Sequence, residues 1–216
     1  YYDSKFQRTF VLKGINLEVT DGEFVSIMGP SGSGKSTLLN IIGLLDAPSA
    51  GQYMLYDKTV LDLKEKPKVD YHRNFMGFIF QAYHLIEDMT VYENIETPLI
   101  YKGVSSRDRK AMVADLLDRF NIVAKKDLFP QQLSGGQQKM VGIARAIIGK
   151  PKLLLADEPT GNLQSARGEM IMESLKTLND EGMTIIQVTH NEKFAGYGKR
   201  IIRLEDGYIR KDEKNV

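Results

Sequence analysis

The stretch "FVSIMGPSGSGKST", residues 24–37, decides the fold. Residues 24–28 form a short apolar run that ends at a glycine, which is typical of a buried strand. The glycines that follow let the backbone fold around phosphate groups, so that successive N–H groups point inward. A helical pattern continues through Leu38, Leu39 and Ile42, and the start of that helix adds a partial positive charge. Strand, glycine loop and helix in this order predict a nucleoside triphosphate site.

The predicted phosphate-binding residues fill this loop and the first helical turn. Lys35 can reach the β- and γ-phosphates, and the hydroxyl of Ser36 can ligate Mg²⁺. The full set is Gly29, Pro30, Ser31, Gly32, Ser33, Gly34, Lys35, Ser36 and Thr37.

Two further apolar runs have the character of buried strands. They are "LLLAD" at 153–157 and "TIIQVTH" at 184–190. Continuous apolar strands that alternate with helical segments predict a parallel sheet covered on both faces. The segment "IIRLEDGYI" at 201–209 predicts a hairpin, because an Asp-Gly pair separates two apolar runs.

Helical periodicity dominates the rest of the chain. Residues 105–122 have one apolar stripe, with Ser105 or Ser106 as the N-cap: Val113, Leu116, Leu117 and Phe120. Residues 164–180 repeat this pattern before Gly182, with Met170, Ile171, Leu175 and Leu178 on the stripe. The middle, about 82–148, lacks convincing strands, so we expect a helical lobe inserted into an α/β core made of residues 1–81 and 149–216.

Three polar residues stand at the ends of the predicted strands. Asp157 can hold Mg²⁺ through water, and Glu158 would then be placed to accept a proton from an attacking water. A solvated acidic strand end is the alternative for this pair. His190 ends the next strand, and although a lone histidine is more often structural, three strand ends that converge on one edge favour a functional role.

A second glycine turn, "LSGGQ" at 133–137, opens another helix. Ser134 is a good N-cap, and the N–H groups of Gly135 and Gly136 can form another anion-binding nest. Taken alone, the motif could be an ordinary capped helix start.

With these motifs in this order, the chain resembles the ATPase subunit of ABC (ATP-binding cassette) transporters along essentially its whole length. "LSGGQ" is the signature of that family. The resemblance implies a single domain over 1–216, with a P-loop NTPase core, a mostly parallel central sheet, an N-terminal antiparallel β portion and the inserted helical lobe. It also implies ATP and Mg²⁺ as ligands.

The resemblance assigns roles residue by residue. Lys35, Gln81, Glu158 and His190 would be catalytic, with Gln81 in "GFIFQ" touching Mg²⁺ or the attacking water. Ser36, Gln81 and Asp157 would hold the metal. In the family two subunits pack head to tail, so the signature turn would close over the ATP of the other copy: Leu133, Ser134, Gly135, Gly136 and Gln137. A loop that crosses to the other subunit would carry Asn162, Leu163 and Gln164.

Two further contacts follow from the resemblance. Tyr2, with Tyr1 as the fallback, would stack on adenine, unless the terminus is frayed and exposed. A groove beside Gln81 would receive a helix of an integral-membrane permease, with some of its predicted lining residues belonging instead to the core of the lobe: Tyr83, Leu85, Ile86 and Tyr92. ATP-dependent homodimerisation and a cytoplasmic position at the inner face of the membrane follow as expectations.

The pattern of "ENIETPLIY" and "DEPTGNL" looks like the lipoprotein-releasing and macrolide-exporter branch, which also includes mechanical transmission, with cell-division proteins as near relatives. Two positions depart from the family. Gln164 stands where Asp is usual, and Met140 stands where an arginine usually follows the signature. Both could slow hydrolysis, so a nucleotide-gated regulatory module with little turnover is the alternative function.

Composition limits the other classes. The chain has 216 residues, a net charge of +1 and no cysteine. Nothing in the charge favours nucleic acid, and the absence of cysteine excludes disulfides and cysteine-bound zinc. The chain lacks the long insertions of DNA-repair ABC proteins and the tandem cassettes of ribosomal ones. No apolar run reaches the ~18 residues of a membrane span, so we expect no direct membrane insertion and a soluble, cytoplasmic protein.

Overall fold

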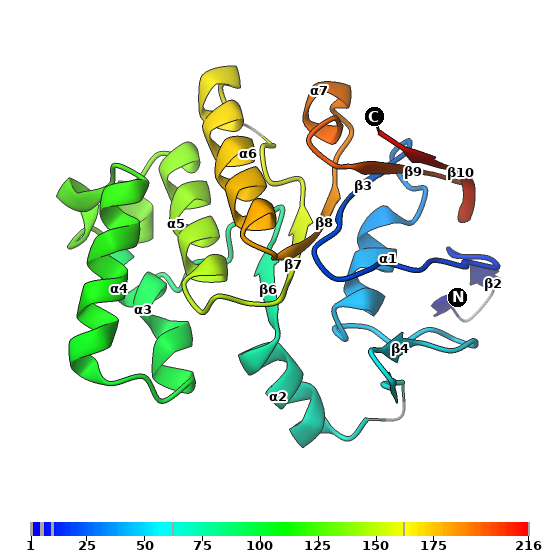
Figure 1. Ribbon diagram of the computed structural model, residues 1–216, viewed down its shortest axis with the longest axis horizontal. Helices are drawn as coiled ribbons and strands as arrows, with labels where there is room; N and C mark the ends of the chain where they lie inside the picture. The colour runs from blue at the N-terminus through cyan, green and yellow to red at the C-terminus, as the bar shows by residue number, and fades with distance from the viewer. Residues whose placement is uncertain (1, 5–6, 10, 62, 162, 216) are drawn as a thin grey trace.

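The computed structural model describes residues 2–4, 7–9, 11–61, 63–161 and 163–215, with side chains described from residue 11 onward (Figure 1). Its centre is a six-stranded sheet with the order β10-β9-β3-β8-β7-β6. The strands are β3 (Phe24–Met28), β6 (Met76–Ile79), β7 (Leu153–Asp157), β8 (Thr184–Val188), β9 (Arg200–Glu205) and β10 (Tyr208–Lys214). Only β10 runs antiparallel to its neighbour. The predicted α/β fold with a mostly parallel sheet is confirmed.

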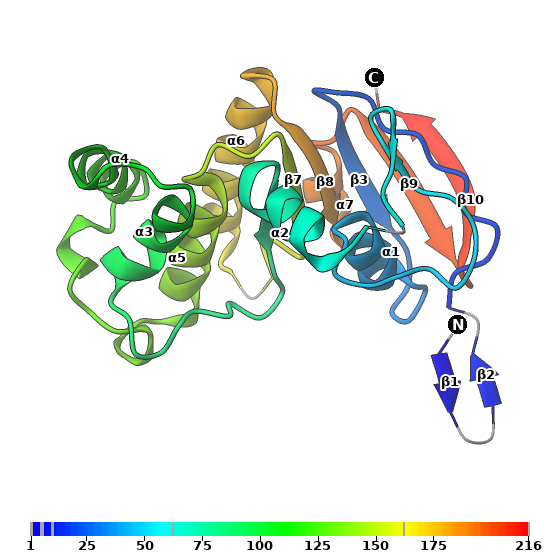
Figure 2. The same cartoon turned by 90° about the horizontal axis from the view of Figure 1, so that it is seen from below.

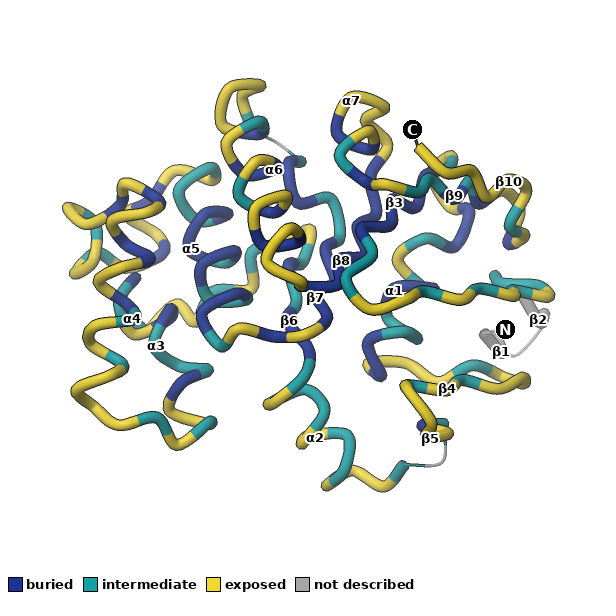
Figure 3. The backbone as a smooth tube through the Cα atoms, in the orientation of Figure 1, coloured by how far each residue is buried: buried dark blue, intermediate teal, exposed yellow. Residues whose placement is uncertain are grey.

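The central strands are buried because helices cover both faces of the sheet, as Figure 3 shows by the dark blue of β3, β7 and β8. Alternate residues of each strand enter two separate hydrophobic clusters. Phe24, Leu154 and Ile185 pack into the cluster that also holds α5 (Gly135–Ile147) and α6 (Ser165–Asp180). Their neighbours enter the other cluster, which contains residues of α1 (Lys35–Ile42): Val25, Leu155 and Ile186. A continuous apolar run is therefore what each strand needs.

The helices α3 (Val91–Tyr101), α4 (Ser106–Arg119) and α5 gather at one end of the molecule, with the short 3₁₀ turns η1 (Val123–Lys125) and η2 (Pro130–Gln132) between them (Figure 1). In sequence they lie between β6 and β7, inside the segment predicted as a helical lobe. Ser105 caps α4 by accepting a hydrogen bond from Asp108, and the predicted apolar stripe of this helix is buried.

Buried Asn94 fixes the chain that enters this helical region. Its side-chain nitrogen donates to the carbonyl oxygens of Ile86, Met89 and Thr90, and its oxygen accepts from the N–H of Ile86. One amide side chain thus contacts four backbone groups of the turn that leads into α3.

The remaining elements are short or peripheral. α2 (Glu65–Asn74) precedes β6, and α7 (Glu192–Ala195) follows β8. Two antiparallel ladders join β1 (Tyr2–Ser4) to β2 (Gln7–Thr9) and β4 (Met54–Leu55) to β5 (Lys58–Thr59). Figure 2 shows the β1–β2 hairpin projecting away from the sheet.

The structure corrects two local predictions and confirms a third. Met170 is exposed, and the buried stripe of α6 continues through Met172 instead, because helical spacing places 168, 171, 172 and 175 on one face. The strand predicted to reach 190 ends at Val188. The hairpin forms as expected, since Asp206 and Gly207 have φ values of 49° and 82°, the left-handed pair that a two-residue turn of this type requires.

Candidate nucleotide-binding and hydrolysis site

The phosphate loop joins the end of β3 to α1, and glycine is obligatory at two of its positions. A Cβ at Gly29 would lie 1.9 Å from the carbonyl oxygen of Leu204. Gly34 has φ of 100°, and a Cβ there would lie 2.8 Å from a methyl group of Leu12. The loop thus achieves its tight path only without side chains.

Gly34 is also the N-cap of α1, where it offers no side chain to accept from the first turn. The first N–H groups of a helix have no partner inside the helix, so here they are left for a ligand. This arrangement places an anion-binding helix terminus directly behind the glycine loop.

The polar side chains of the loop fit a phosphate ligand. The Lys35 ammonium lies over the loop and donates to the carbonyl oxygens of Gly29 and Pro30 at 2.9 and 2.7 Å. The buried hydroxyl of Ser33 has no hydrogen-bond partner among the described residues. A buried hydroxyl without a partner costs free energy, and a phosphate oxygen would relieve that cost.

Glu158 and His190 meet at the ends of β7 and β8. Oε1 of Glu158 lies 2.7 Å from Nδ1 of His190 and accepts the backbone N–H of His190 at 3.1 Å. Glu158 is the less exposed partner, with 12% of its side chain accessible against 75% for His190. The backbone of Glu158 has φ of 48°, a conformation that costs free energy for a non-glycine residue and is typical of functional sites.

Three of the four residues predicted to be catalytic line one cleft of about 390 Å³: Gln81, Glu158 and His190. Lys35 is not among its lining residues and stays in the phosphate loop. β8 pairs with both β3 and β7, so the loop and the two acidic residues stand at the same edge of the sheet, one strand apart. The predicted convergence of three strand ends is therefore present.

The residues predicted to hold Mg²⁺ supply only oxygen donors: the hydroxyl of Ser36, the amide oxygen of Gln81 and the carboxylate of Asp157. Within the described ranges no group of three or more His, Cys, Asp or Glu side chains could form a metal site. Few protein carboxylates fit Mg²⁺ well, since this ion keeps waters and takes phosphate oxygens as its other ligands. The donor set thus fits a metal that arrives with a nucleotide.

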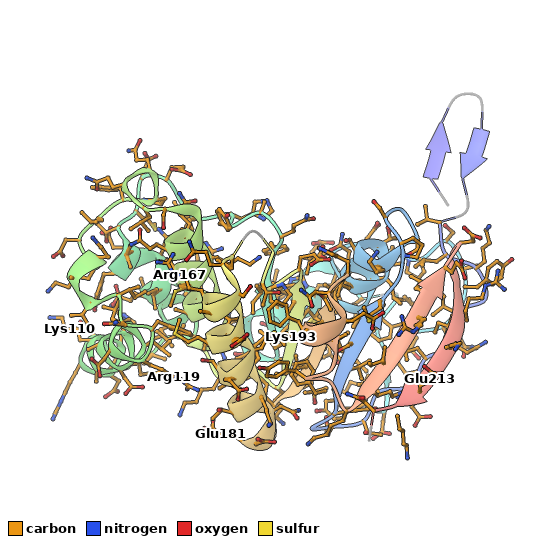
Figure 4. The ribbon with its side chains drawn as sticks, turned by 90° about the horizontal axis from the view of Figure 1, so that it is seen from above. Lys110, Arg119, Arg167, Glu181, Lys193 and Glu213 are labelled. Atoms are coloured by element: carbon orange, nitrogen blue, oxygen red, sulfur yellow. The ribbon has the colours of Figure 1, made fainter. Side chains whose placement is uncertain are left out.

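The signature turn forms the start of α5 and has a complete capping box. The Ser134 side chain accepts from the N–H of Gln137, and the Gln137 side chain accepts from the N–H of Ser134. In Figure 4, Arg167 lies where α6 meets α5, and its guanidinium approaches Gly136. All five signature residues are described, and none of them lines the cleft around Glu158.

The residues of the predicted dimer loop and of the adenine contact are only partly described. Asn162 and Tyr1 lie outside the described residues, as does the side chain of Tyr2. Leu163 lines the cleft. Gln164 is exposed and is the N-cap of α6, where its side chain makes no capping hydrogen bond.

The four residues predicted to line a permease groove do not share one environment. Leu85 and Tyr92 pack against the hydrophobic cluster of the helices, which was the alternative for this segment. Tyr83 places its hydroxyl over Gly135 of the signature turn. Ile86 is exposed.

Two cations of α5, which were not among the predicted site residues, hold the segment around Gln81. Lys139 Nζ donates to the carbonyl oxygen of Phe80 at 2.9 Å. Arg145 donates to the carbonyl oxygens of Tyr83 and His84 at 3.2 and 2.8 Å. The only signal in the sequence is that apolar or small residues surround them, since every residue from 140 to 147 except Arg145 is of this kind.

Comparison with known proteins identifies the family. The ABC transporter family model matches residues 12–161. The ABC transporter ATP-binding protein MJ0796 of Methanocaldococcus jannaschii is 46% identical over 210 residues, which are 95% of this chain and 89% of that protein. The macrolide export ATP-binding/permease protein MacB of Bdellovibrio bacteriovorus is 47% identical over 204 residues, which are 94% of this chain and 31% of MacB. The chain therefore spans about a third of the MacB relatives that it matches.

Solved structures support the same family assignment. A dimeric structure of a post-hydrolysis state of MJ0796, bound to ADP and Pi, matches with a TM-score of 0.95 at 43% identity and covers 100% of this chain and 95% of that one. A second dimeric structure of MJ0796 gives a TM-score of 0.96 at 44% identity.

Fold and site together define an α/β ATPase with a glycine phosphate loop. The chain belongs to the ABC transporter family, as an ATP-binding cassette whose ATP hydrolysis is coupled to transport. Its similarity to MacB and MJ0796 confirms the branch that the sequence resembles. Among the described residues, no helix is both long and apolar enough to cross a membrane.

Proposed function

We propose that two copies of this chain enclose two ATP molecules, each held by the phosphate loop of one copy and covered by the signature turn of the other. The observation that carries this proposal is the position of the cleft. Gln81, Glu158 and His190 line it, whereas no signature residue of the same chain does. The MJ0796 structure, which is dimeric and bound to ADP and Pi, supports a nucleotide-bound dimer.

The roles of the site residues follow from their chemistry. Residues 29–37 bind the phosphates through backbone N–H groups and the Lys35 ammonium. Glu158 accepts the proton of the attacking water, and Gln81 orients that water. Nδ1 of His190 lies against Glu158, so Nε2 is the ring nitrogen that remains for the γ-phosphate, and it must carry a proton to donate to a phosphate oxygen. Tyr2 stacks on the adenine ring.

The metal acts by charge. Mg²⁺, when bound, neutralises charge on the β- and γ-phosphates. Ser36, Asp157 and Gln81 would hold it.

ATP thus acts as part of the interface between two copies. ATP binds the closed pair better than the open one, so binding favours closure and hydrolysis favours separation. The helical lobe, about 82–148, moves with the signature turn that it carries. In this dimer the predicted crossing loop of Asn162, Leu163 and Gln164 would contact the other copy.

The lobe would act on an integral-membrane permease, as the fusion of cassette and permease in the name of MacB suggests. Exposed Ile86 is the residue best placed for this contact among the four predicted, because Leu85 and Tyr92 are committed to the lobe core. The protein would then sit at the inner face of the cytoplasmic membrane through its permease. Lipoprotein release, export of drugs or peptides, and transmission of mechanical force are the activities of this branch, and no nucleic acid is involved.

Replacing Glu158 with Gln tests the shared site. In steady-state assays with Mg·ATP we expect Glu158→Gln to lower kcat by about 100-fold or more, because an amide cannot accept the water proton. Light scattering should report a doubled mass for this variant with ATP and a single mass without it. Glu181→Gln, an exposed change at the far end of α6, is the matched control and should leave both readouts unchanged.

Two results would separate the competing ideas. If Glu158→Gln keeps a single mass at saturating Mg·ATP, even with its permease present, the shared site is wrong. If it dimerises but the unmodified protein turns over no faster than the variant, the protein is a nucleotide-gated regulatory module.

A further inference from the structure

Lys139 is a buried lysine in the middle of the molecule. It lies in the second turn of α5, and only 2% of the residue is accessible to solvent. Lysine is almost never buried to this degree unless its ammonium is paired. Here the ammonium donates to the carbonyl oxygen of Phe80 at 2.9 Å.

Phe80 immediately precedes Gln81, the residue that lines the cleft beside Glu158. Residues 80–84 follow the end of β6 and belong to no helix or strand, so their backbone carbonyls depend on outside partners. Three of these carbonyls receive hydrogen bonds from α5. Lys139 donates to the first, and Arg145 donates to those of Tyr83 and His84.

The charges around Lys139 come from the end of β7, where Glu158 lines the cleft. The carboxylates of Asp157 and Glu158, at the end of β7, attract its ammonium. The ring of Tyr83 lies beneath the ammonium, with its centroid 6.0 Å from Nζ. Lys139 therefore contacts or faces three segments: the signature helix, the chain before Gln81, and the acidic end of β7.

We propose that Lys139 is a positioning residue, which anchors the Phe80 peptide to the signature helix and so holds Gln81 in the cleft opposite Glu158. This inference rests on the proposed function of the cleft. Because Lys139 acts through the backbone of Phe80, it should affect turnover more than nucleotide affinity.

The neighbouring residue explains why this anchor matters in this chain. Met140, which stands where the family usually has an arginine, is 5% exposed and packs in the hydrophobic cluster of the helices. Successive residues of a helix point about 100° apart, so the cation at 139 faces the β6–β7 edge while Met140 faces the lobe core. The positive charge of this helix turn therefore lies on Lys139, which donates to the Phe80 carbonyl oxygen.

The anchor also links two parts of the proposed mechanism. Lys139 lies five residues after the N-cap Ser134, or about 7.5 Å along the same helix. A movement that brings the signature turn toward a second copy therefore carries the Phe80 carbonyl, and Gln81 with it. Closure and the position of Gln81 become one event.

The test compares Lys139→Met with Lys102→Met in the whole chain. Lys102 is the matched control, because its ammonium also donates to a backbone carbonyl, that of Gly149 at 2.6 Å, but beyond the opposite end of α5. In steady-state ATPase assays we expect Lys139→Met to lower kcat about tenfold or more and to change KM for ATP by no more than about twofold. We expect Lys102→Met to keep kcat within about twofold, whatever it does to thermal stability.

Two further variants decide the outcome if Lys139→Met does not fold. Lys139→Arg keeps a cation that can reach the Phe80 carbonyl and should keep kcat within about threefold. Lys139→Gln, whose amide nitrogen ends one bond short of the ammonium, should lose turnover.

The inference is overturned if Lys139→Met or Lys139→Gln turns over like the unmodified protein, or if Lys102→Met lowers kcat as much as Lys139→Met does. Failure of the proposed function would give a different result, because the unmodified protein would then be no more active than Glu158→Gln.

Discussion

The carboxylate of Glu158 accepts from both the ring and the backbone N–H of His190, at 2.7 and 3.1 Å. Two hydrogen bonds from one residue fix the orientation of the other. The side chain at the end of β7 and the loop after β8 are therefore held as one unit before any ligand is considered.

Removing the imidazole should uncouple this unit. We expect His190→Ala to lower kcat about 10- to 100-fold, because Glu158 loses its partner and the γ-phosphate loses a contact. Steady-state ATPase assays measure the effect. His72→Ala is the control: its ring contacts the Gly43 carbonyl oxygen at 2.8 Å outside the cleft, so it should affect stability but not kcat. Equal losses of kcat in the two variants would contradict the assignment.

Gln164 offers a test at the start of α6. It is an N-cap without a capping hydrogen bond, and Asp caps helices far better. We expect Gln164→Asp to stabilise the fold by about 1 kcal/mol, raising Tm by about 2–4 °C. It should also raise turnover or tighten the ATP-bound dimer by returning a charge to the predicted dimer loop.

Gln164→Ser separates these two effects, since serine caps the helix but adds no charge. Thermal melts should respond to both variants, and light scattering with ATP only to Gln164→Asp. If both variants affected dimerisation equally, the added charge of Gln164→Asp would not be the cause.

The burial of Lys139 makes stability depend on pH. Burial lowers the pKa of Lys139 from 10.5 to about 8, against the attraction of Asp157 and Glu158, with Tyr83 as the remaining titratable neighbour. Between these two pKa values the unfolded chain binds more protons than the folded one, so folding stability rises with pH. Relative to Lys139→Met, the free energy of unfolding should increase by about 1 kcal/mol from pH 7 to pH 9. Urea unfolding at both pH values measures this, and a difference that stays constant would contradict the low pKa.

Much of the fold was predictable because strong local signals agreed with the global arrangement. The strands at 24–28 and 153–157 are continuous apolar runs because both of their faces are buried. Ser105 and the Asp206-Gly207 pair carry turn and cap chemistry that needs no tertiary information.

Elements that depend on their neighbours were not predictable in the same way. β6 is short and contains Gly77, which reads as a strand breaker. Glycine is needed there because a Cβ would lie 2.5 Å from the carbonyl oxygen of Ala146 in α5. α2 is mostly polar and buries no residue, and Val69 and Tyr71 alone do not make a hydrophobic period that could be detected.

The residues of the candidate site also differ in how well the sequence predicts them. Glycine loops and acidic strand ends can be identified from residue type and spacing, so the positions of Lys35, Glu158 and His190 were predictable. Lys139 could not, because a lysine in a helix normally faces solvent. Only the close approach of Phe80 and the acidic end of β7 turns it into an internal donor.

The carbonyl oxygen of Leu204 occupies the space that a side chain at Gly29 would need. The small space beside Gly29, beneath the C-terminal hairpin, is therefore needed both for the packing of the sheet and for the path of the phosphate loop. A mutagenesis screen for folded protein that no longer binds nucleotide would recover changes at Lys35, whose side chain is only partly buried. It would never recover them at Gly29, where any added atom pushes apart two strands of the sheet.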